Sequence, residues 1–356
     1  MTTVPSVLYV GSYAAADQPG IYTYTFDTTS TALTAHSSFA GITNPSFLFP
    51  HPNGEWLYAV SETGQHDDGK PGEVWALRLY PDQDKIEPLN HQPSGGDFPC
   101  HLAIDATGRW LLVSNYGSGT VGVLPILEDG ALGALSDLVQ HHGTGPNAER
   151  QEGPHVHSVT FTPDQRFAIV ADLGIDALVL YTLDPQSGKL HEHTRVTTRP
   201  GAGPRHAAFH PDGEHLYVAN ELDNTVAVYR YDAGNGTLQE QQIIPTLPPD
   251  TPSSIVAEST VADIHLSPTA DRVYVSNRGR DSIAIFAVAA DRHLSALAYV
   301  SSGGHYPRNF AVTSDGRSLL VANQLSNELV VVPTQYEQAG TPLTKISVPG
   351  ASCVRF

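Results

Sequence analysis

Seven copies of one short pattern recur along this chain, and the seventh is complete only if the two ends of the chain meet. The clearest copy is Pro-Arg-His-Ala-Ala-Phe-His-Pro-Asp-Gly-Glu-His-Leu-Tyr-Val-Ala-Asn-Glu at 204–221. The other copies begin near Pro45, Pro99, Val156, Val261, Pro307 and Ala351. A repeat with this spacing, built from short strands, is typical of a β-propeller.

Each copy has the pattern of short antiparallel strands joined by tight turns. Residues 205–209 open the copy with an alternating pattern. A period of two indicates a strand with one buried face. The turn at 211–213 is Pro-Asp-Gly, which suits the positive φ of a tight hairpin. Further strands follow, as at 216–219 and 225–229. We therefore predict an all-β fold, a seven-bladed β-propeller with four antiparallel strands per blade, forming a single domain over residues 1–356.

The two ends of the chain complete one blade in this interpretation. Residues 351–356 resemble a first strand that nothing follows, and residues 8–13 resemble a second strand that nothing precedes. Together they make blade seven. This closure leaves no inner strand edge open for unwanted pairing.

Composition limits the partners that such a protein can have. The formal net charge of -18 argues against nucleic acid and against an anionic membrane surface. We find no apolar run near the ~18 residues that a membrane span needs. The N-terminus lacks the features of a secretion signal, and two cysteines cannot form a disulfide framework, so we expect a reduced, cytoplasmic setting.

The repeat also predicts which side chains share one face of the disc. In an antiparallel pair the start of one strand lies beside the end of the next. An offset of 16 residues pairs Arg205 with Glu221, Cys100 with Tyr116 and Arg308 with Gln324. The positions that end the second strands are Tyr13, Glu62, Tyr116, Leu173, Glu221, Arg278 and Gln324. Such diverse residues at equivalent places suggest a ligand site.

The first strands add basic residues to the same face. They bring Arg205, His206, Arg308, His101, His157 and Asp263, and a two-residue insertion adds His155. The long connection at 143–153 crosses this face and carries Arg150. Several arginines around one site suit a carboxylate or phosphate, which a guanidinium binds in a fork. His155 or His157 could move a proton near neutral pH, and Glu221 could be a second base or simply hold Arg205.

At this point the sequence resembles the seven-bladed lactonase, or cycloisomerase-2, family. The resemblance covers essentially the whole chain. It depends on Gly-Pro-Asn-Ala-Glu-Arg-Gln at 145–151, Pro-His-Val-His-Ser at 154–158, Gly-Pro-Arg-His at 203–206, Ala-Asn-Glu at 219–221 and Val-Ser-Asn-Arg-Gly at 275–279. It implies lactone chemistry without a metal or other cofactor. Asp263 departs from the family pattern, where we expect a glutamate.

The resemblance also implies roles for individual residues. It places a catalytic group on His155, Arg205, Glu221 and Arg278, with His157 as an alternative to His155. The residues that we expect to bind substrate are Tyr13, Glu62, His101, Tyr116, Arg150, His206, Arg308 and Gln324. The expected ligand is a small anionic sugar lactone or a related carboxylate.

Three functions remain open from the sequence. The first is a carboxylic ester hydrolase acting on 6-phosphogluconolactone, in which arginines hold the anion and a histidine activates water. The second is a cycloisomerase of the muconate-lactonising kind. The third is a non-catalytic binding scaffold, because fold alone does not determine chemistry. The oligomeric state is open as well.

Overall fold

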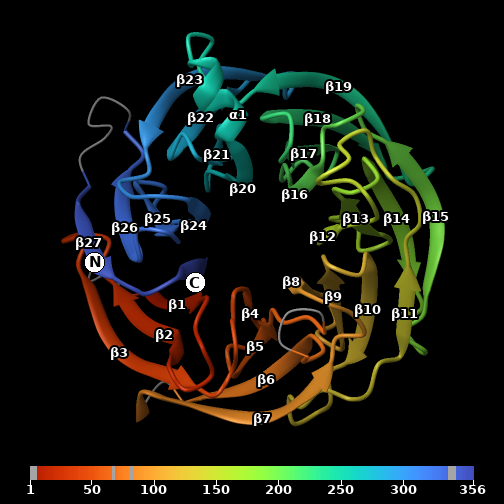
Figure 1. The fold of residues 1–356 in the computed structure, drawn as a ribbon, viewed down its shortest axis with the longest axis vertical. Helices are drawn as coiled ribbons and strands as arrows, with labels where there is room; N and C mark the ends of the chain where they lie inside the picture. The colour runs from red at the N-terminus through yellow and green to blue at the C-terminus, as the bar shows by residue number, and fades with distance from the viewer. Residues whose placement is uncertain (1–5, 66–68, 81–82, 336–341) are drawn as a thin grey trace.

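Seven four-stranded antiparallel sheets surround a central axis (Figure 1). The computed structural model describes residues 6–65, 69–80, 83–335 and 342–356. The predicted seven-bladed propeller and its four strands per blade are confirmed. Six blades run outward in sequence order from their first strand, next to the axis, to their fourth strand at the rim, and the seventh takes its innermost strand from the C-terminus (Figure 1).

The strands of the first four blades follow the repeat. Blade one has β4 (Leu48–Pro50), β5 (Trp56–Ser61), β6 (Glu73–Tyr80) and β7 (Lys85–Pro93). Blade two has β8 (Pro99–Ile104), β9 (Trp110–Asn115), β10 (Thr120–Pro125) and β11 (Asp137–Gln140). Blade three has β12 (Val156–Phe161), β13 (Ala168–Asp172), β14 (Ala177–Leu183) and β15 (Leu190–Thr197). Blade four has β16 (Pro204–Phe209), β17 (His215–Asn220), β18 (Thr225–Asp232) and β19 (Thr237–Pro245).

The remaining blades include the closure. Blade five has β20 (Thr260–Leu266), β21 (Arg272–Arg278), β22 (Ser282–Val288) and β23 (Leu294–Ser301). Blade six has β24 (Pro307–Val312), β25 (Ser318–Asn323), β26 (Glu328–Pro333) and β27 (Thr344–Ser347). Blade seven has β28 (Ala351–Arg355), β1 (Ser6–Ser12), β2 (Pro19–Phe26) and β3 (Leu33–Ala40). A short helix, α1 (Ser253–Glu258), precedes blade five.

The core lies between the blades rather than inside them. Second strands such as β25 are buried along their whole length, because a neighbouring blade covers each face. Outer strands such as β15 and β27 alternate between more and less exposed residues, since only one face is covered. Leu8 and Val10 of blade seven, for example, pack with Leu320 and Ala322 of blade six. Each blade therefore needs both neighbours to bury its apolar surface.

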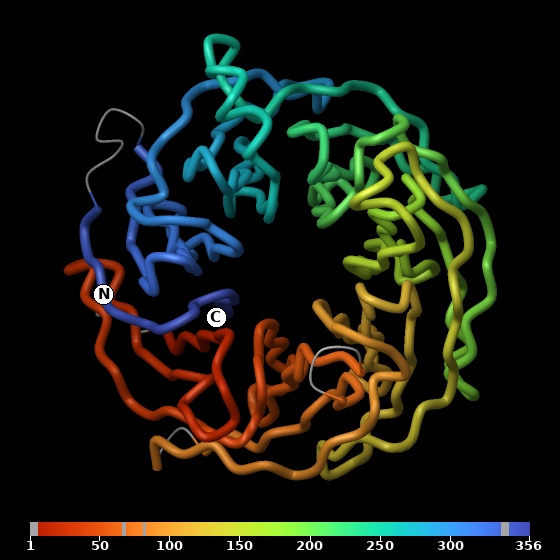
Figure 2. The backbone as a smooth tube through the Cα atoms, in the orientation of Figure 1, coloured from red at the N-terminus to blue at the C-terminus, as the bar shows by residue number. Residues whose placement is uncertain are grey.

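The predicted closure of blade seven is confirmed. The C-terminal strand β28 pairs antiparallel with the N-terminal strand β1 (Figure 2). The Ser352 hydroxyl donates to the Ser46 carbonyl at 2.9 Å, and the Leu48 amide donates to Cys353 Sγ at 3.3 Å. The last strand of the chain thus also joins blade seven to blade one.

A β-bulge near the start of the first strand recurs in blades two to six, and a matching register shift occurs where β28 pairs with β1. In blade four, Pro204 pairs with Asn220 and His206 pairs with Ala219, so Arg205 is the extra residue. The 16-residue offset had placed Arg205 directly opposite Glu221, but the backbone partner of Glu221 is Gly203. A bulge turns its extra side chain out of the regular alternation. The Arg205 side chain nevertheless meets Glu221, with Nε 2.9 Å from Oε2.

Candidate active site

The candidate site lies on the face of the disc where the first strands begin and the second strands end, which we call the site face. Both sets of residues singled out from the sequence meet there. Tyr13, Glu62, Tyr116 and Gln324 are half-buried, whereas Arg205, Glu221 and Arg278 lie deeper and are almost fully buried. The site therefore has an outer polar layer above an inner charged layer.

Glu221 is the centre of the inner layer, because three guanidinium groups contact its carboxylate. Arg205 Nε and Arg278 Nη2 each lie 2.9 Å from Oε2, and Arg150 Nη2 lies 2.6 Å from Oε1. Burial alone would raise the pKa of Glu221. The charges of Arg278, Arg205 and Arg150 outweigh that effect and hold the pKa well below its usual range. Glu221 is therefore an ionised acceptor, which does not suit the second-base role considered from the sequence.

Arg205 is held on several sides of its guanidinium plane. Besides the contact of Nε with Glu221, Nη1 donates to the carbonyl of Ala262 and lies 3.2 Å from His206 Nε2. Burial, and then the charge of Arg278, lower the pKa of Arg205 to about 10. Within the described ranges no residue accepts a hydrogen bond from Nη2, so this nitrogen is available to a ligand.

Arg278 and Arg308 each lie over an aromatic ring. The Arg278 guanidinium lies 5.2 Å from the ring centre of Tyr306, and Arg308 lies 5.2 Å from that of Tyr13. Arg308 Nη2 is 3.8 Å from Oε1 of Glu62, which is too long for a hydrogen bond. Glu62 instead accepts from the Tyr13 hydroxyl at 2.7 Å. The Arg308 donors thus make no hydrogen bond to any part of the chain that is described.

His155 stands beside this cluster in a defined tautomer. Its Nδ1 lies 2.9 Å from the Tyr116 carbonyl oxygen, which can only accept, so Nδ1 carries the proton. Nε2 lies 3.2 Å from Oε1 of Glu152. A carboxylate can only accept, so this second contact is a hydrogen bond when Nε2 carries a proton as well. The ring also stacks on Tyr116, with centroids 4.4 Å apart. Nε2 is therefore the nitrogen at which His155 can exchange a proton, and Glu152 stabilises the protonated ring.

A buried network holds the backbone of His155. Asp172 Oδ1 accepts from the His155 amide at 2.8 Å, and Asp172 Oδ2 lies 2.7 Å from His141 Nδ1. The Tyr181 hydroxyl contacts the other nitrogen of His141 at 2.9 Å. Gly174 packs so closely that a Cβ there would lie 1.9 Å from the Gly153 carbonyl oxygen. These contacts leave the His155 backbone little freedom to shift.

His157 occupies a different environment, although it is only two residues away. It is the bulge residue of blade three and is buried. Its Nδ1 lies 3.8 Å from the thiol of Cys100, which fills the equivalent position in blade two. Burial, and then the charge of Arg205, lower the pKa of His157 well below its ordinary value. His157 is therefore a neutral wall residue, whereas His155 faces a carboxylate.

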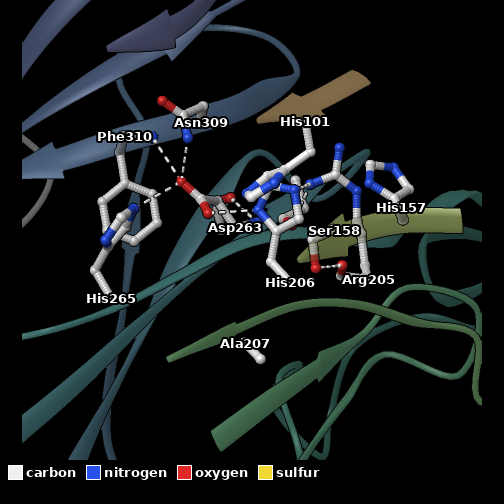
Figure 3. Close-up of polar contacts among 12 residues, drawn as sticks. His101, His157, Ser158, Arg205, His206, Ala207, Asp263, His265, Asn309 and Phe310 are labelled. Atoms are coloured by element: carbon white, nitrogen blue, oxygen red, sulfur yellow. Dashed lines mark hydrogen bonds and ion pairs between the residues drawn. The ribbon is translucent and has the colours of Figure 1, made fainter. Parts of the chain in front are cut away.

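A second polar cluster lies beside Arg205 (Figure 3). The Asp263 carboxylate accepts hydrogen bonds from His206 Nδ1 at 2.8 Å, from His265 Nε2 at 2.9 Å and from the side-chain amide of Asn309. Burial alone would raise the pKa of Asp263, but its contacts with His265 and His206 hold that pKa well below the usual range. His101 lies nearby, with its ring centre 5.3 Å from that of His206. Both nitrogens of His206 are engaged by protein groups.

The loop that carries Arg150 is anchored by its neighbour in the sequence. Gln151 is buried, and its amide donates to the Leu173 carbonyl and to Asp176 Oδ1, both at 2.8 Å. Arg150 itself remains 37% exposed and also donates to the Tyr116 hydroxyl at 3.3 Å. It is the outermost of the three arginines around Glu221.

Contacts link most of the predicted site residues into one constellation. A chain of contacts runs from His155 through Tyr116, Arg150 and Glu221 to Arg205 and Arg278. Gln324 is separate: it makes no hydrogen bond to these residues, and its Oε1 is buried without a partner among the described atoms. The catalytic and binding roles of all these residues stay predictions.

Sequence reasoning missed several residues that the structure brings into the site. Glu152 contacts His155, and it was available in the Glu-Gly-Pro-His run. Tyr306 lies under Arg278, and its only signal was an aromatic residue directly before a first strand. Asn309 had no signal at all.

Among the described residues, no group of three or more His, Cys, Asp or Glu side chains could hold a metal ion. No described helix is both long enough and apolar enough to pass through a bilayer.

Fold and site together define a seven-bladed propeller with an arginine-rich site on one face. The sequence pattern of the family "Lactonase, 7-bladed beta-propeller" matches residues 7–356. The chain therefore belongs to this lactonase family, as its motifs indicated.

Individual relatives carry names that agree with the family. The chain is 36% identical over 353 residues to a 6-phosphogluconolactonase of Bacillus subtilis, covering 98% of this chain and 97% of the relative. It is 32% identical over 331 residues to a 6-phosphogluconolactonase of Formosa agariphila, covering 91% of each. The solved periplasmic gluconolactonase of Pseudomonas aeruginosa superposes with a TM-score of 0.90 at 31% identity, covering 99% of both chains.

Proposed function

We propose that this protein is a lactonase that hydrolyses 6-phosphogluconolactone to 6-phosphogluconate. The names of two relatives support this substrate, and family membership supports the reaction class. The observation that carries the proposal is the junction of Arg150, Arg205 and Arg278 on the single carboxylate of Glu221. This junction brings three guanidinium groups to one carboxylate, a local excess of positive charge that favours an anionic ligand although the whole chain is strongly acidic.

The phosphate of the substrate needs donors that the protein does not already use. A phosphate monoester carries between one and two negative charges at neutral pH and offers three acceptor oxygens. Arg308 makes no hydrogen bond to the described part of the chain, and it lies beside the aromatic ring of Tyr13. Arg150 is the most exposed arginine of the site. Arg308 and Arg150 therefore suit the capture of the phosphate.

His155 is the better candidate for the general base. Its Nδ1 is bound to the Tyr116 carbonyl, so Nε2 is the nitrogen that exchanges a proton. Glu152 faces Nε2 from a side chain that is 60% exposed, so it can turn away to admit water and return to stabilise the protonated ring. In our mechanism Nε2 takes a proton from a water molecule whose oxygen attacks the lactone carbonyl. His157 is less suitable, because its buried ring disfavours the protonated state that a base must reach.

Arg205 stabilises the charge that develops during this attack. The carbonyl oxygen becomes an oxyanion, and a preorganised donor directed at it is typically a large part of catalysis in acyl chemistry. Arg205 Nη2 is the unused donor of a guanidinium that Glu221, Ala262 and His206 hold in place. The ester C–O bond then breaks, and the proton on His155 passes to the departing alkoxide oxygen. The products are the ring-opened hydroxyl and the carboxylic acid.

We further propose a cytoplasmic location. Cys100 and Cys353 are both buried and unpaired, which agrees with a reducing compartment. Detection of the native protein in the soluble intracellular fraction, with its two thiols reduced, would support this location. Recovery from an extracytoplasmic fraction, as the name of the Pseudomonas aeruginosa relative would suggest, would refute it.

Acid release in a pH-stat tests the activity, with a buffer blank because lactones hydrolyse unaided. We expect purified protein to exceed the blank with 6-phosphogluconolactone and to be slower with unphosphorylated gluconolactone. His155→Ala should lower kcat by roughly 100-fold, since a general base contributes on the order of 10²–10⁴. His157→Ala should lower it far less.

The outcomes separate the alternatives. A wild-type rate equal to the blank with both lactones would refute the lactonase proposal. Faster turnover of the unphosphorylated lactone would support lactone hydrolysis and refute the proposal that the substrate is phosphorylated. A larger loss in His157→Ala than in His155→Ala would reverse the assignment of the base.

A further inference from the structure

We propose that His206 is a positioning residue that, held by Asp263, orients the Arg205 guanidinium for catalysis. This inference rests on the role of Arg205 in the proposed function. His206 Nε2 lies 3.2 Å from Arg205 Nη1, and His206 Nδ1 lies 2.8 Å from Asp263 Oδ1 (Figure 3). The three side chains form a continuous hydrogen-bonded line under the site face.

Only one protonation state of His206 satisfies both contacts. A guanidinium can only donate, so Nε2 must supply a lone pair to Arg205 Nη1. A carboxylate can only accept, so Nδ1 must carry the proton that is donated to Asp263. His206 is therefore neutral with its proton on Nδ1. The opposite tautomer, or a protonated ring, would place an N–H against the N–H of Arg205.

Asp263 fixes the His206 ring from a rigid position. Its carboxylate also accepts from His265 Nε2 at 2.9 Å, from the Asn309 side chain and from the Phe310 amide at 3.3 Å. These donors come from blades five and six, while His206 belongs to blade four. Asn309 Oδ1 in turn accepts from the Val354 amide at 2.7 Å. The network ties four neighbouring first strands together and leaves Asp263 little freedom to move.

The buried position of His206 argues against direct contact with substrate. Its side chain is 9% exposed, and both ring nitrogens have protein partners. Its contact instead helps to fix the Arg205 guanidinium. Arg205 Nε donates to Glu221, and Nη1 donates to the Ala262 carbonyl and to His206. Only Nη2 remains for an incoming oxygen. A rotated guanidinium would lose that alignment.

A matched pair of variants separates positioning from packing. His206→Gln supplies a side-chain amide that can donate to Asp263 and a carbonyl that can accept from Arg205. His206→Leu fills a similar volume with neither group. We expect His206→Leu to lower kcat about 10- to 100-fold with KM changed less than about threefold, because small misalignments of catalytic groups have effects of this order. His206→Gln should keep kcat within about fivefold of wild type.

His265→Leu is the control for damage to the network. This change removes one hydrogen bond to Asp263 but leaves the line from Asp263 through His206 to Arg205 intact. We expect a lower Tm with kcat within about twofold of wild type. Equal losses of kcat in His206→Leu and His265→Leu, or equal losses in His206→Gln and His206→Leu, would overturn the positioning role.

A measurement without substrate keeps the inference testable if the protein proves inactive on 6-phosphogluconolactone. The ¹⁵N shifts of the His206 ring at pH 7 should report a neutral ring protonated at Nδ1. A wild-type ring protonated at Nε2 or doubly protonated would overturn the proposal, whatever the activity.

Discussion

Arg150 Nη2 lies 2.6 Å from Glu221 Oε1, although 71 residues separate the two in the chain. The Glu221 side chain is 3% exposed, whereas that of Arg150 is 37% exposed. Arg150 therefore covers the buried carboxylate from the solvent side. Because it comes from a loop rather than from a first or second strand, it can change partner without disturbing a blade.

The exposed position of Arg150 leads to the first prediction. Arg150→Ala should raise KM for the phosphorylated lactone about tenfold, because a charge-assisted contact to phosphate is worth on the order of 1.5 kcal/mol. The Tm should fall only slightly, because Arg205 and Arg278 still contact the Glu221 carboxylate when the partly exposed Arg150 is removed. Steady-state kinetics and a thermal melt measure both effects. Arg150→Lys is the control, and it should recover part of the loss; an unchanged KM in Arg150→Ala would contradict the role.

The second prediction concerns the carboxylate at the centre of the cluster. Glu221→Gln leaves Arg205 and Arg278 buried without their counter-charge, which typically costs about 3–5 kcal/mol. We expect a lower Tm and the loss of most activity. Inorganic phosphate should raise the Tm of this variant more than that of wild type, because it replaces the missing anion.

Glu62→Gln is the matched control for this prediction. Its nearest arginine nitrogen lies 3.8 Å away, so no buried guanidinium loses a hydrogen bond. This variant should melt much closer to wild type. An equal fall in Tm in Glu62→Gln and Glu221→Gln would show that the three-arginine junction contributes no more to stability than the contacts of Glu62.

The third prediction is that mild acid destabilises the fold through buried neutral histidines. Burial, and then the charge of Arg205, lower the pKa of His206 from 6.5 to about 4 in the native state. Between these values the unfolded chain binds more protons than the native one, so the free energy of unfolding falls as pH falls through this window. The effect of this one shift is about 3 kcal/mol. Burial acts in the same direction on His101 and His157.

Urea unfolding at several pH values between 7 and 4 measures this dependence. His206→Gln removes one of the groups and should flatten the curve in that range. The carboxylates Glu221 and Asp263 have native pKa values below their usual range. Their protonation therefore lowers the free energy of unfolding only at still lower pH. A free energy of unfolding that is constant from pH 7 to 4 would contradict the neutral state of these rings.

The fourth prediction tests the closure of the ring. Deleting residues 351–356 removes strand β28, including Ser352 and Cys353, which contact blade one. We expect a large fall in Tm, or failure to fold, because blades six and one lose apolar contacts and β1 loses its inner partner. Deleting Phe356 alone is the control, since it lies beyond β28 and is exposed. Similar melting of the long truncation and the full chain would contradict the closure.

Much of the architecture could be predicted from the repeat. The repeated alternation, Gly-containing turns and incomplete ends were sufficient for seven blades and for the closure by residues 351–356. The repeat also predicted that Arg205, Glu221 and Arg278 share one face, and that Cys100 fills in blade two the place of Arg205 in blade four. Backbone hydrogen bonding and apolar burial follow a period, so a periodic sequence carries this information.

The chemistry within the site could not be predicted in the same way. The sequence left His155 and His157 as equals, and contacts with the Tyr116 carbonyl and Glu152 distinguish them. It left open whether Glu221 acts as a base, and the proximity of three arginines makes it an acceptor.

The sequence by itself thus determined the seven blades, their closure and many of the residues that gather on the site face, but not Glu152, Tyr306 or Asn309. Only the tertiary structure decided how the polar atoms of those residues meet. Bulges take Arg205 and its equivalents out of the regular alternation, and tautomers and ionisation depend on which donor or acceptor lies within about 3 Å. Those neighbours come from different blades and from the loop at 143–153, and no repeat along the chain specifies their relative orientation.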